Sequence, residues 1–283
     1  MNYRHAFHAG NHADVLKHVV LMMLVAHLKK KTAPFFYLDT HAGAGTYDLS
    51  LGESQRSGEY KRGIGRLLEF PDVALPPEVL DYVRLVRDCA GAGRSAITAY
   101  PGSPSIVARL RRPTDRMVLV ETHAHEARWL RNSLGRQKLL SLVEGDGYAA
   151  VKAHTPPREN RGLVLMDPPY ESELEFDSVL AALETGYERW PTGTYCVWYP
   201  LTERAGALRF RRNLERSNLR KVLDCTLSVM PADTPVGLRG SGLVIVNPPW
   251  QLDGRLAELL PDLHRLLVPD GSGGTTVEWR VGE

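Results

Sequence analysis

Short apolar runs alternate with helix-like segments along most of this chain, and this alternation is the feature that most limits how it folds. Val179, Leu180 and Leu183, for example, recur at helical spacing between two such runs. Strands that alternate with helices are typical of a mostly parallel sheet covered on both faces. We therefore predict an α/β protein with one doubly wound sheet of seven strands, near residues 35–39, 117–121, 141–144, 162–166, 194–199, 222–229 and 243–246.

The N-terminal part predicts a helix over residues 11–31, with Asn11 as its N-cap. After the first predicted strand, one spacing is abnormal. In nucleotide-binding sheets an acidic residue ends the second strand ~20 residues beyond the glycine loop, whereas here Glu121 lies 76 positions after Gly45. We interpret residues 1–283 as one domain that carries a small helical insertion at about residues 53–100.

A glycine loop, Asp39-Thr40-His41-Ala42-Gly43-Ala44-Gly45, follows the first strand. The third glycine of a dinucleotide fingerprint would fall at position 48, which is Asp48. Asp39 would repel a pyrophosphate but attract a cation. S-adenosylmethionine carries a sulfonium and an ammonium and has no phosphate, so the loop favours this cofactor over NAD, with Gly43 at the close approach.

Two later strand ends fit the same ligand. Glu121 ends the run from residue 117, where a carboxylate can bind ribose hydroxyls. Asp146 follows the next strand and is placed for the adenine amine, and Gly147 leaves room for the ring. Either acid alone would fit a polar loop equally well. Both together, after the glycine loop, favour the cofactor.

The strongest local signal is Asp167-Pro168-Pro169-Tyr170 at the end of a buried strand. An adenine N6 amine has two hydrogens, of which the Asp167 carboxylate would accept one and the Pro168 carbonyl the other. This arrangement would aim the nitrogen lone pair at a sulfonium methyl group. Asp167 could take the released proton, and Tyr170 could stack on a flipped base.

A second copy of the pattern, Asn247-Pro248-Pro249-Trp250, follows the seventh strand. Pro-Pro after a strand can also be a plain turn. Only the strand after Asp146 is expected beside the first strand, at the switch point where ligands bind. We therefore assign Asp167 to catalysis and Asn247 to structure.

The opening Tyr3-Arg4-His5-Ala6-Phe7-His8-Ala9-Gly10-Asn11-His12-Ala13-Asp14-Val15-Leu16-Lys17-His18 and the motifs above, with Tyr100-Pro101-Gly102-Ser103-Pro104, carry a family resemblance. The whole chain resembles the 23S ribosomal RNA adenine-N6 methyltransferase family, ribosomal RNA large subunit methyltransferase J. The resemblance implies a class I S-adenosylmethionine-dependent methyltransferase fold. It also implies that Asp167 is the catalytic residue, that Tyr3 lies near the RNA base, that Lys17 helps at the site, and that the cofactor contacts are His18, His41, Ser103, Glu121, Asp146, Gly147 and Asp167.

Charge and cysteine usage add limits. The net charge of +2 decides nothing, but residues 109–116 and 209–221 are rich in arginine and could neutralise phosphates or simply be solvated helix faces.

Three widely spaced cysteines predict neither disulfides nor zinc. His5, His8 and His12 match no zinc spacing, so we expect local hydrogen bonds and no metal. No membrane span or signal sequence is expected, and the chain reads as a cytoplasmic monomer.

The resulting hypothesis is methylation of adenine N6 in 23S ribosomal RNA, on naked or partly assembled RNA, during ribosome biogenesis. Two alternatives remain open. The same chemistry could act on DNA adenine or a protein glutamine amide, since the Pro-Pro-aromatic motif alone allows both. The chain could also be an RNA-binding assembly factor with a vestigial fold, although intact acids at 39, 121, 146 and 167 argue against decay.

Overall fold

The computed structural model describes residues 5–50, 52–91, 98–202, 206–231, Thr234 and 237–282. Ten α-helices, three short 3-10 helices and ten strands are assigned within these residues. The helices are η1 (His5–Phe7), α1 (His12–Lys29), α2 (Gly52–Ser57), η2 (Glu59–Arg62), α3 (Ile64–Leu67), η3 (Asp72–Ala74), α4 (Pro77–Ala90), α5 (Ser103–Leu110), α6 (Ala124–Leu134), α7 (Gly147–His154), α8 (Leu174–Arg189), α9 (Gly206–Arg216) and α10 (Leu252–Leu267). The strands are β1 (Phe36–Asp39), β2 (Thr46–Asp48), β3 (Ala99–Pro101), β4 (Arg116–Glu121), β5 (Leu140–Glu144), β6 (Gly162–Met166), β7 (Thr194–Leu201), β8 (Val222–Ser228), β9 (Gly240–Val246) and β10 (Gly274–Val281).

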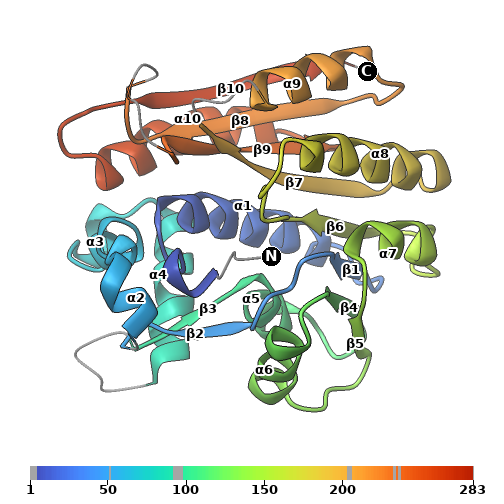
Figure 1. Ribbon diagram of the computed structural model, residues 1–283, viewed down its shortest axis with the longest axis horizontal. Coiled ribbons are helices and arrows are strands. Elements are labelled where there is room, and N and C mark those ends of the chain that lie inside the picture. The colour runs from blue at the N-terminus through green and yellow to red at the C-terminus, as the bar shows by residue number, and fades with distance from the viewer. Residues whose placement is uncertain are drawn as a thin grey trace.

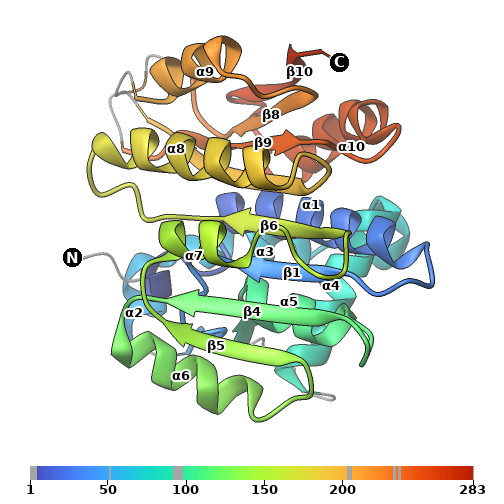
Figure 2. The same cartoon turned by 90° about the vertical axis from the view of Figure 1, so that its right-hand side faces the viewer.

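The central sheet has eight strands in the order β10-β8-β9-β7-β6-β1-β4-β5 (Figures 1 and 2). Strands β5, β4, β1, β6 and β7 are parallel, whereas β9 runs antiparallel to both of its neighbours and β10 antiparallel to β8. All seven predicted strands are present, and the predicted class I methyltransferase fold is confirmed. Strands β4 and β5 are added on one side of β1, and β6 and β7 on the other. The switch point therefore lies at the carboxyl end of β1.

The central sheet has eight strands, one more than the seven predicted. β10 escaped prediction because it is an edge strand with a half-exposed, mixed sequence, Gly274–Val281, rather than an apolar run. A separate two-stranded sheet of β2 and β3 was also not foreseen. Between these two strands lie α2, η2, α3, η3 and α4, in the stretch where an insertion is predicted.

Alternating side chains of the strands build two cores. On β6, Leu163 and Leu165 face a core formed with α1, α4, α5 and α10, while Val164 and Met166 face a core formed with α7, α8 and α9. Both faces of the sheet are therefore covered, which is why its strands read as continuous apolar runs.

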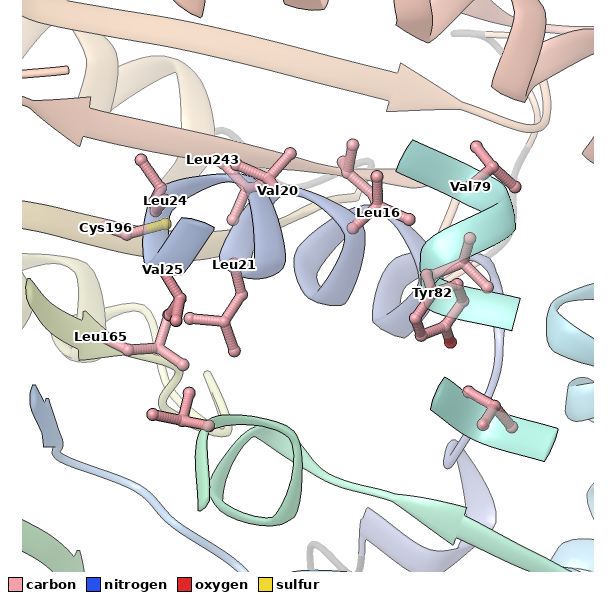
Figure 3. Close-up of a cluster of buried hydrophobic side chains, with 14 of the residues drawn as sticks. Leu16, Val20, Leu21, Leu24, Val25, Val79, Tyr82, Leu165, Cys196 and Leu243 are labelled. Carbon is pink, nitrogen blue, oxygen red and sulfur yellow. The ribbon is translucent and has the colours of Figure 1, made fainter. Parts of the chain in front are cut away.

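Helix α1 lies in the larger core and begins as predicted at Asn11, whose side-chain oxygen accepts hydrogen bonds from the Ala13 and Asp14 amides. Figure 3 shows its buried side chains between α4 and the sheet, where Leu165, Cys196 and Leu243 come from β6, β7 and β9. Because so much of α1 is buried, its position is fixed firmly. Its first turns carry polar residues that are also buried: Asp14, Lys17 and His18.

Leu243→Ala is expected to destabilise the protein by about 2–5 kcal/mol, because Leu243 is fully buried beside α1 and its truncation leaves a cavity. Leu208→Ala is the matched control: this leucine is 56% exposed on α9, and its loss should change stability by no more than about 0.5 kcal/mol. Urea denaturation measures both. Equal effects of the two substitutions would contradict the core described above.

Candidate active site

A cavity of about 660 Å³ opens at the carboxyl edge of the parallel strands, in the size range of a small-molecule site. Figure 2 shows the arrowheads of β1, β4, β5 and β6 at this edge, beside α2. Nine of the residues predicted from the sequence line the cavity: Lys17, His18, His41, Gly43, Ser103, Glu121, Asp146, Gly147 and Asp167. The structure thus brings together residues that are spread over 150 positions of the chain.

The glycine loop is held in place by the end of β4. Gly43 adopts a left-handed backbone conformation, with φ of 60°, and its amide donates a 2.8 Å hydrogen bond to Glu121 Oε2. Glu121 Oε1 accepts from the amide of His123 at 2.8 Å. The carboxylate that the sequence assigns to a ribose is therefore braced on both oxygens. This bracing sets its orientation before a ligand arrives.

The end of β5 approaches the loop closely. Asp146 caps α7, since its Oδ1 accepts from the Tyr148 amide at 2.8 Å. A Cβ atom on Gly147 would lie 2.1 Å from the carbonyl oxygen of Thr40. Glycine is thus required at 147 by the backbone of the loop itself. The prediction that it leaves room for an adenine ring has not been tested, but the tightness of this position has a structural cause.

Asp39 lies beneath the loop and is fully buried. Its Oδ2 accepts hydrogen bonds from the hydroxyls of Tyr37 at 2.8 Å and Ser103 at 2.7 Å, whereas its Oδ1 has no partner. Burial outweighs the two hydrogen bonds and raises the pKa of Asp39 to about 6. Sequence reasoning placed this carboxylate near a cation, and the unpaired oxygen is consistent with that role.

Asp167, at the end of β6, is joined to α1 by a buried lysine. Lys17 Nζ lies 2.5 Å from Asp167 Oδ2 and 2.8 Å from Asp14 Oδ1. Burial disfavours the ammonium, but the two carboxylates outweigh it and hold the pKa of Lys17 well above its usual value. The Asp167 side chain keeps 15% of its surface exposed and lines the cavity. Lys17 therefore orients the carboxylate without removing it from the cavity.

The two predicted histidines are neutral. Burial lowers the pKa of His18 to about 3 and that of His41 to about 4. His18 Nδ1 lies 2.7 Å from the Tyr100 hydroxyl, and its buried Nε2, 3.9 Å from Asp14 Oδ1, has no hydrogen-bond partner among the described residues. Thr40 donates its hydroxyl hydrogen to the Leu165 carbonyl, so the 2.8 Å contact between Thr40 Oγ1 and His41 Nδ1 requires the histidine to be the donor. His41 Nε2 is then an acceptor.

Three predicted residues do not line the cavity. Pro168 is buried, and the Tyr170 hydroxyl donates to the Trp198 carbonyl at 2.8 Å while its ring packs 4.5 Å from that of Phe176. Stacking of Tyr170 on a base remains a prediction that requires this ring to turn outward. Tyr3, the predicted substrate contact, lies outside the described residues.

The second Pro-Pro copy lies at the opposite ends of the strands from the cavity. β7 is parallel to β6 and β9 is antiparallel to β7, so the residues after β9 leave the edge opposite the cavity. The Asn247 amide group donates to the carbonyls of Pro191 and Gly193 at 2.8 and 2.7 Å. Asn247 thus closes a loop far from Asp167.

The sequence did not reveal several residues that line the cavity: His5, Tyr47, Glu53, His123, Tyr148 and Glu175. Tyr148 follows Asp146-Gly147 directly and could have been included on that ground. The 2.6 Å hydrogen bond from its hydroxyl to Glu175 had no sequence signal, because Glu175 belongs to α8. His5 makes a local contact with Asp14 at 3.0 Å, as expected, whereas His8 contacts Glu59, 51 positions along the chain, at 3.0 Å. The buried Nε2 of His12 has no hydrogen-bond partner among the described residues.

The cavity fits a cationic cofactor. Its lining includes Glu121, Asp146 and Asp167, while Lys17 is already paired with two carboxylates. The unpartnered polar atoms Asp39 Oδ1 and His18 Nε2 are buried beneath or beside it. S-adenosylmethionine would meet these groups with two positive charges and hydroxyls. The fold and this cavity define an S-adenosylmethionine-dependent methyltransferase.

Comparison with known proteins identifies the family. The family model described as Ribosomal RNA large subunit methyltransferase D, RlmJ, matches residues 32–281, and the chain belongs to this family. Over 283 residues it is 46% identical to Ribosomal RNA large subunit methyltransferase J of Haemophilus influenzae and 41% identical to that of Escherichia coli, with 100% of each chain covered. A crystal structure of a Legionella pneumophila protein matches with a TM-score of 0.87 and 34% identity, over 96% of this chain and 98% of that one.

Asp39→Asn is expected to change how stability depends on pH. The pKa of Asp39 is raised from 3.8 to about 6 in the folded state, so the folded protein binds this proton more tightly than the unfolded chain. The stability that this tighter proton binding contributes is present below about pH 4 and is lost as pH rises from about 4 to about 6. The stability of wild type relative to the variant should fall by about 3 kcal/mol over this window and then level off. Urea titrations at a series of pH values measure the difference. A difference that stays constant with pH would contradict the raised pKa.

Proposed function

We propose that this chain transfers a methyl group from S-adenosylmethionine to the exocyclic N6 of an adenine in 23S ribosomal RNA. The observation that carries the proposal is the position of Asp167: a partly exposed carboxylate at the carboxyl end of β6, beside the glycine loop and oriented by Lys17. Family membership supports an RNA substrate, since its relatives are named as ribosomal RNA methyltransferases.

The residues of the chain position the amine. S-adenosylmethionine supplies an activated methyl group. Lys17 occupies Asp167 Oδ2, which leaves Oδ1 to accept one hydrogen of the adenine amine. The Pro168 carbonyl accepts the other hydrogen, which requires the backbone at Pro168, now outside the cavity lining, to turn towards the amine. With both hydrogens held, the nitrogen lone pair is directed towards the methyl group, and this orientation replaces the search that free reactants would need.

Asp167 also receives the proton that the amine loses after transfer. Protonation of Asp167 would remove one of the two negative charges beside Lys17. Asp14, which lies 2.8 Å from Lys17 and bonds the Gly10 amide at 2.9 Å, keeps the buried ammonium paired at that stage. A second carboxylate is needed because a buried, unpaired charge costs several kcal/mol.

The target adenine must leave its helix or be unpaired to reach the cavity. Naked or partly assembled RNA is therefore the proposed substrate, and the proposed place of action is the cytoplasm, with the enzyme as a monomer. Within the described residues, no helix is both long and apolar enough to cross a membrane. Tyr3 and Tyr170 are the proposed contacts to the base, and Lys17 acts through Asp167.

Asp167→Ala is expected to lower kcat/KM for a 23S transcript by at least about 100-fold, since both the amine acceptor and the proton acceptor are lost. Nucleoside mass spectrometry of N6-methyladenosine after incubation with S-adenosylmethionine measures this. Asp177→Ala is the control, because this carboxylate is 54% exposed on α8 and outside the cavity. Asp177→Ala should keep the wild-type melting profile, whereas Asp167→Ala should melt at a lower temperature, because the buried Lys17 loses one of its two carboxylates. Activity is therefore compared at a temperature at which both variants are folded.

Absence of methylated adenosine with wild-type protein that binds the cofactor would sink the ribosomal RNA assignment. DNA containing adenine and intact large subunits run beside the transcript as competing substrates. Preference for DNA would show that the substrate is DNA rather than RNA. Activity on intact subunits alone would overturn the proposal that free RNA is the substrate.

A further inference from the structure

Four arginines of the two arginine-rich stretches, residues 109–116 and 209–221, are paired with acids within the fold. Near β4, Arg112 pairs with Asp115 at 3.0 Å and Arg116 with Glu159 at 2.8 Å. On α9, Arg211 lies 3.0 Å from Asp224, and Arg209 lies 3.6 Å from both Glu173 and Asp177. These four arginines hold elements of the fold together and are less available to an RNA backbone.

Three other cations are left uncompensated. Arg56 on α2 and Lys61 and Arg62 on η2 are exposed, and none has an ion-pair partner in the part of the chain that the structure describes. The acid between them, Glu59, is already engaged by His8 and Asn11. We call these three side chains the insertion cations.

Of the insertion cations, Arg56 lies next to the mouth of the cavity, and Lys61 and Arg62 follow on the adjoining helix η2. Glu53 of α2 and His5 and Ala6 of η1 line the cavity. Ser54 of the same helix donates to the Ala6 carbonyl at 2.8 Å, and the Arg56 guanidinium lies over the Phe7 ring at 5.6 Å from its centroid. A strand that leaves the cavity past residues 5–7 therefore meets Arg56 first. In Figure 2, α2 lies at the same end of the sheet as the arrowheads of β1 and β4.

This surface is also rigidly attached to the site. The Ile64 amide donates to the Gly10 carbonyl at 2.8 Å, and a Cβ on Gly63 would lie 2.1 Å from the same oxygen. The turn after η2 is thus packed directly on the backbone that leads into α1. Because α1 carries Lys17 and His18, a phosphate held by the insertion cations keeps a fixed relation to the reacting residues.

We propose that the insertion cations bind phosphates of the RNA segment next to the target adenine, and that the helical segment after β2 serves as the RNA-docking surface. This inference rests on the proposed function, which supplies the RNA. The three cations act as a group of backbone contacts that position the strand without reading its sequence. They hold the flanking strand while the base occupies the cavity.

The test compares two triple variants. The first replaces Arg56, Lys61 and Arg62 with glutamate. The second, the matched control, replaces Arg212, Arg216 and Arg220 with glutamate. These three arginines are exposed, as the insertion cations are. The control residues lie on α9 and on the segment between α9 and β8. Because β8 is parallel to β7, it begins at the strand ends opposite the cavity, and the chain of α9 approaches those ends. Figures 1 and 2 both show α9 well apart from α2.

For the first variant, KM for the 23S transcript should rise about 10-fold or more while kcat changes little, since the reacting residues are untouched. S-adenosylmethionine affinity and the melting profile should match wild type. The slope of log RNA affinity against log salt concentration should shrink by about 2, since each single-strand phosphate contact contributes about 0.7. The control should leave all five quantities near wild type.

Unchanged RNA affinity in the first variant, or an equal loss in the control, would overturn the proposal. RNA affinity is measured by equilibrium binding without catalysis, so the docking surface is tested even if wild type methylates no RNA. That last result would count against the proposed function alone. Should the glutamate variant fail to match the wild-type melting profile, the corresponding triple glutamine variant gives the same comparison.

Discussion

The buried ion pair between Lys17 and Asp167 joins the N-terminal helix to the end of a central strand, and the site depends on it. Lys17 is bonded to Asp167 at 2.5 Å and to Asp14 at 2.8 Å, in surroundings from which water is largely excluded. Removing either carboxylate would leave part of a buried charge uncompensated, at a cost of several kcal/mol. The lysine therefore fixes both the position of α1 and the orientation of the carboxylate proposed to hold the substrate amine.

The remaining charges of the site follow from the same balance between burial and pairing. For His18 and His41, loss of solvation outweighs the nearby carboxylates and lowers the pKa, so each offers a hydrogen-bonding nitrogen rather than a charge. Asp39 is buried with two hydroxyl donors, and burial outweighs these donors and the attraction of Lys17, so its pKa rises. The outcome is a cavity lined by carboxylates, with its one lysine already paired. Such a cavity suits a cationic methyl donor.

Prediction of the fold from sequence succeeded where burial leaves a pattern. All seven apolar runs are strands, and the helix beginning at Asn11 is α1, because strands buried on both faces and capped helices have clear local signals. The edge strand β10 lacks such a signal, since one side of it faces solvent. For the site, acids at strand ends were found by their place after β4, β5 and β6. Glu175 and Glu53 reach the cavity from helices whose orientation no local pattern specifies.

The sequence by itself determined the strand order along the chain, the glycine loop and the carboxylates that follow successive strands, because each depends on local backbone chemistry. The order of the strands also predicted that Asp167, and not Asn247, faces the cavity, and the tertiary structure shows the strand directions that separate the two motifs. Asp167 follows a strand parallel to β1, whereas Asn247 follows one that runs the other way and emerges at the opposite edge. The tertiary structure decided which cations are paired, since Arg211 and Arg116 contact buried or half-buried acids, while Arg56 and Lys61 contact no acid among the described residues. The reason is physical: pairing of strands and of charges joins residues far apart in the chain, and no local pattern records those distances.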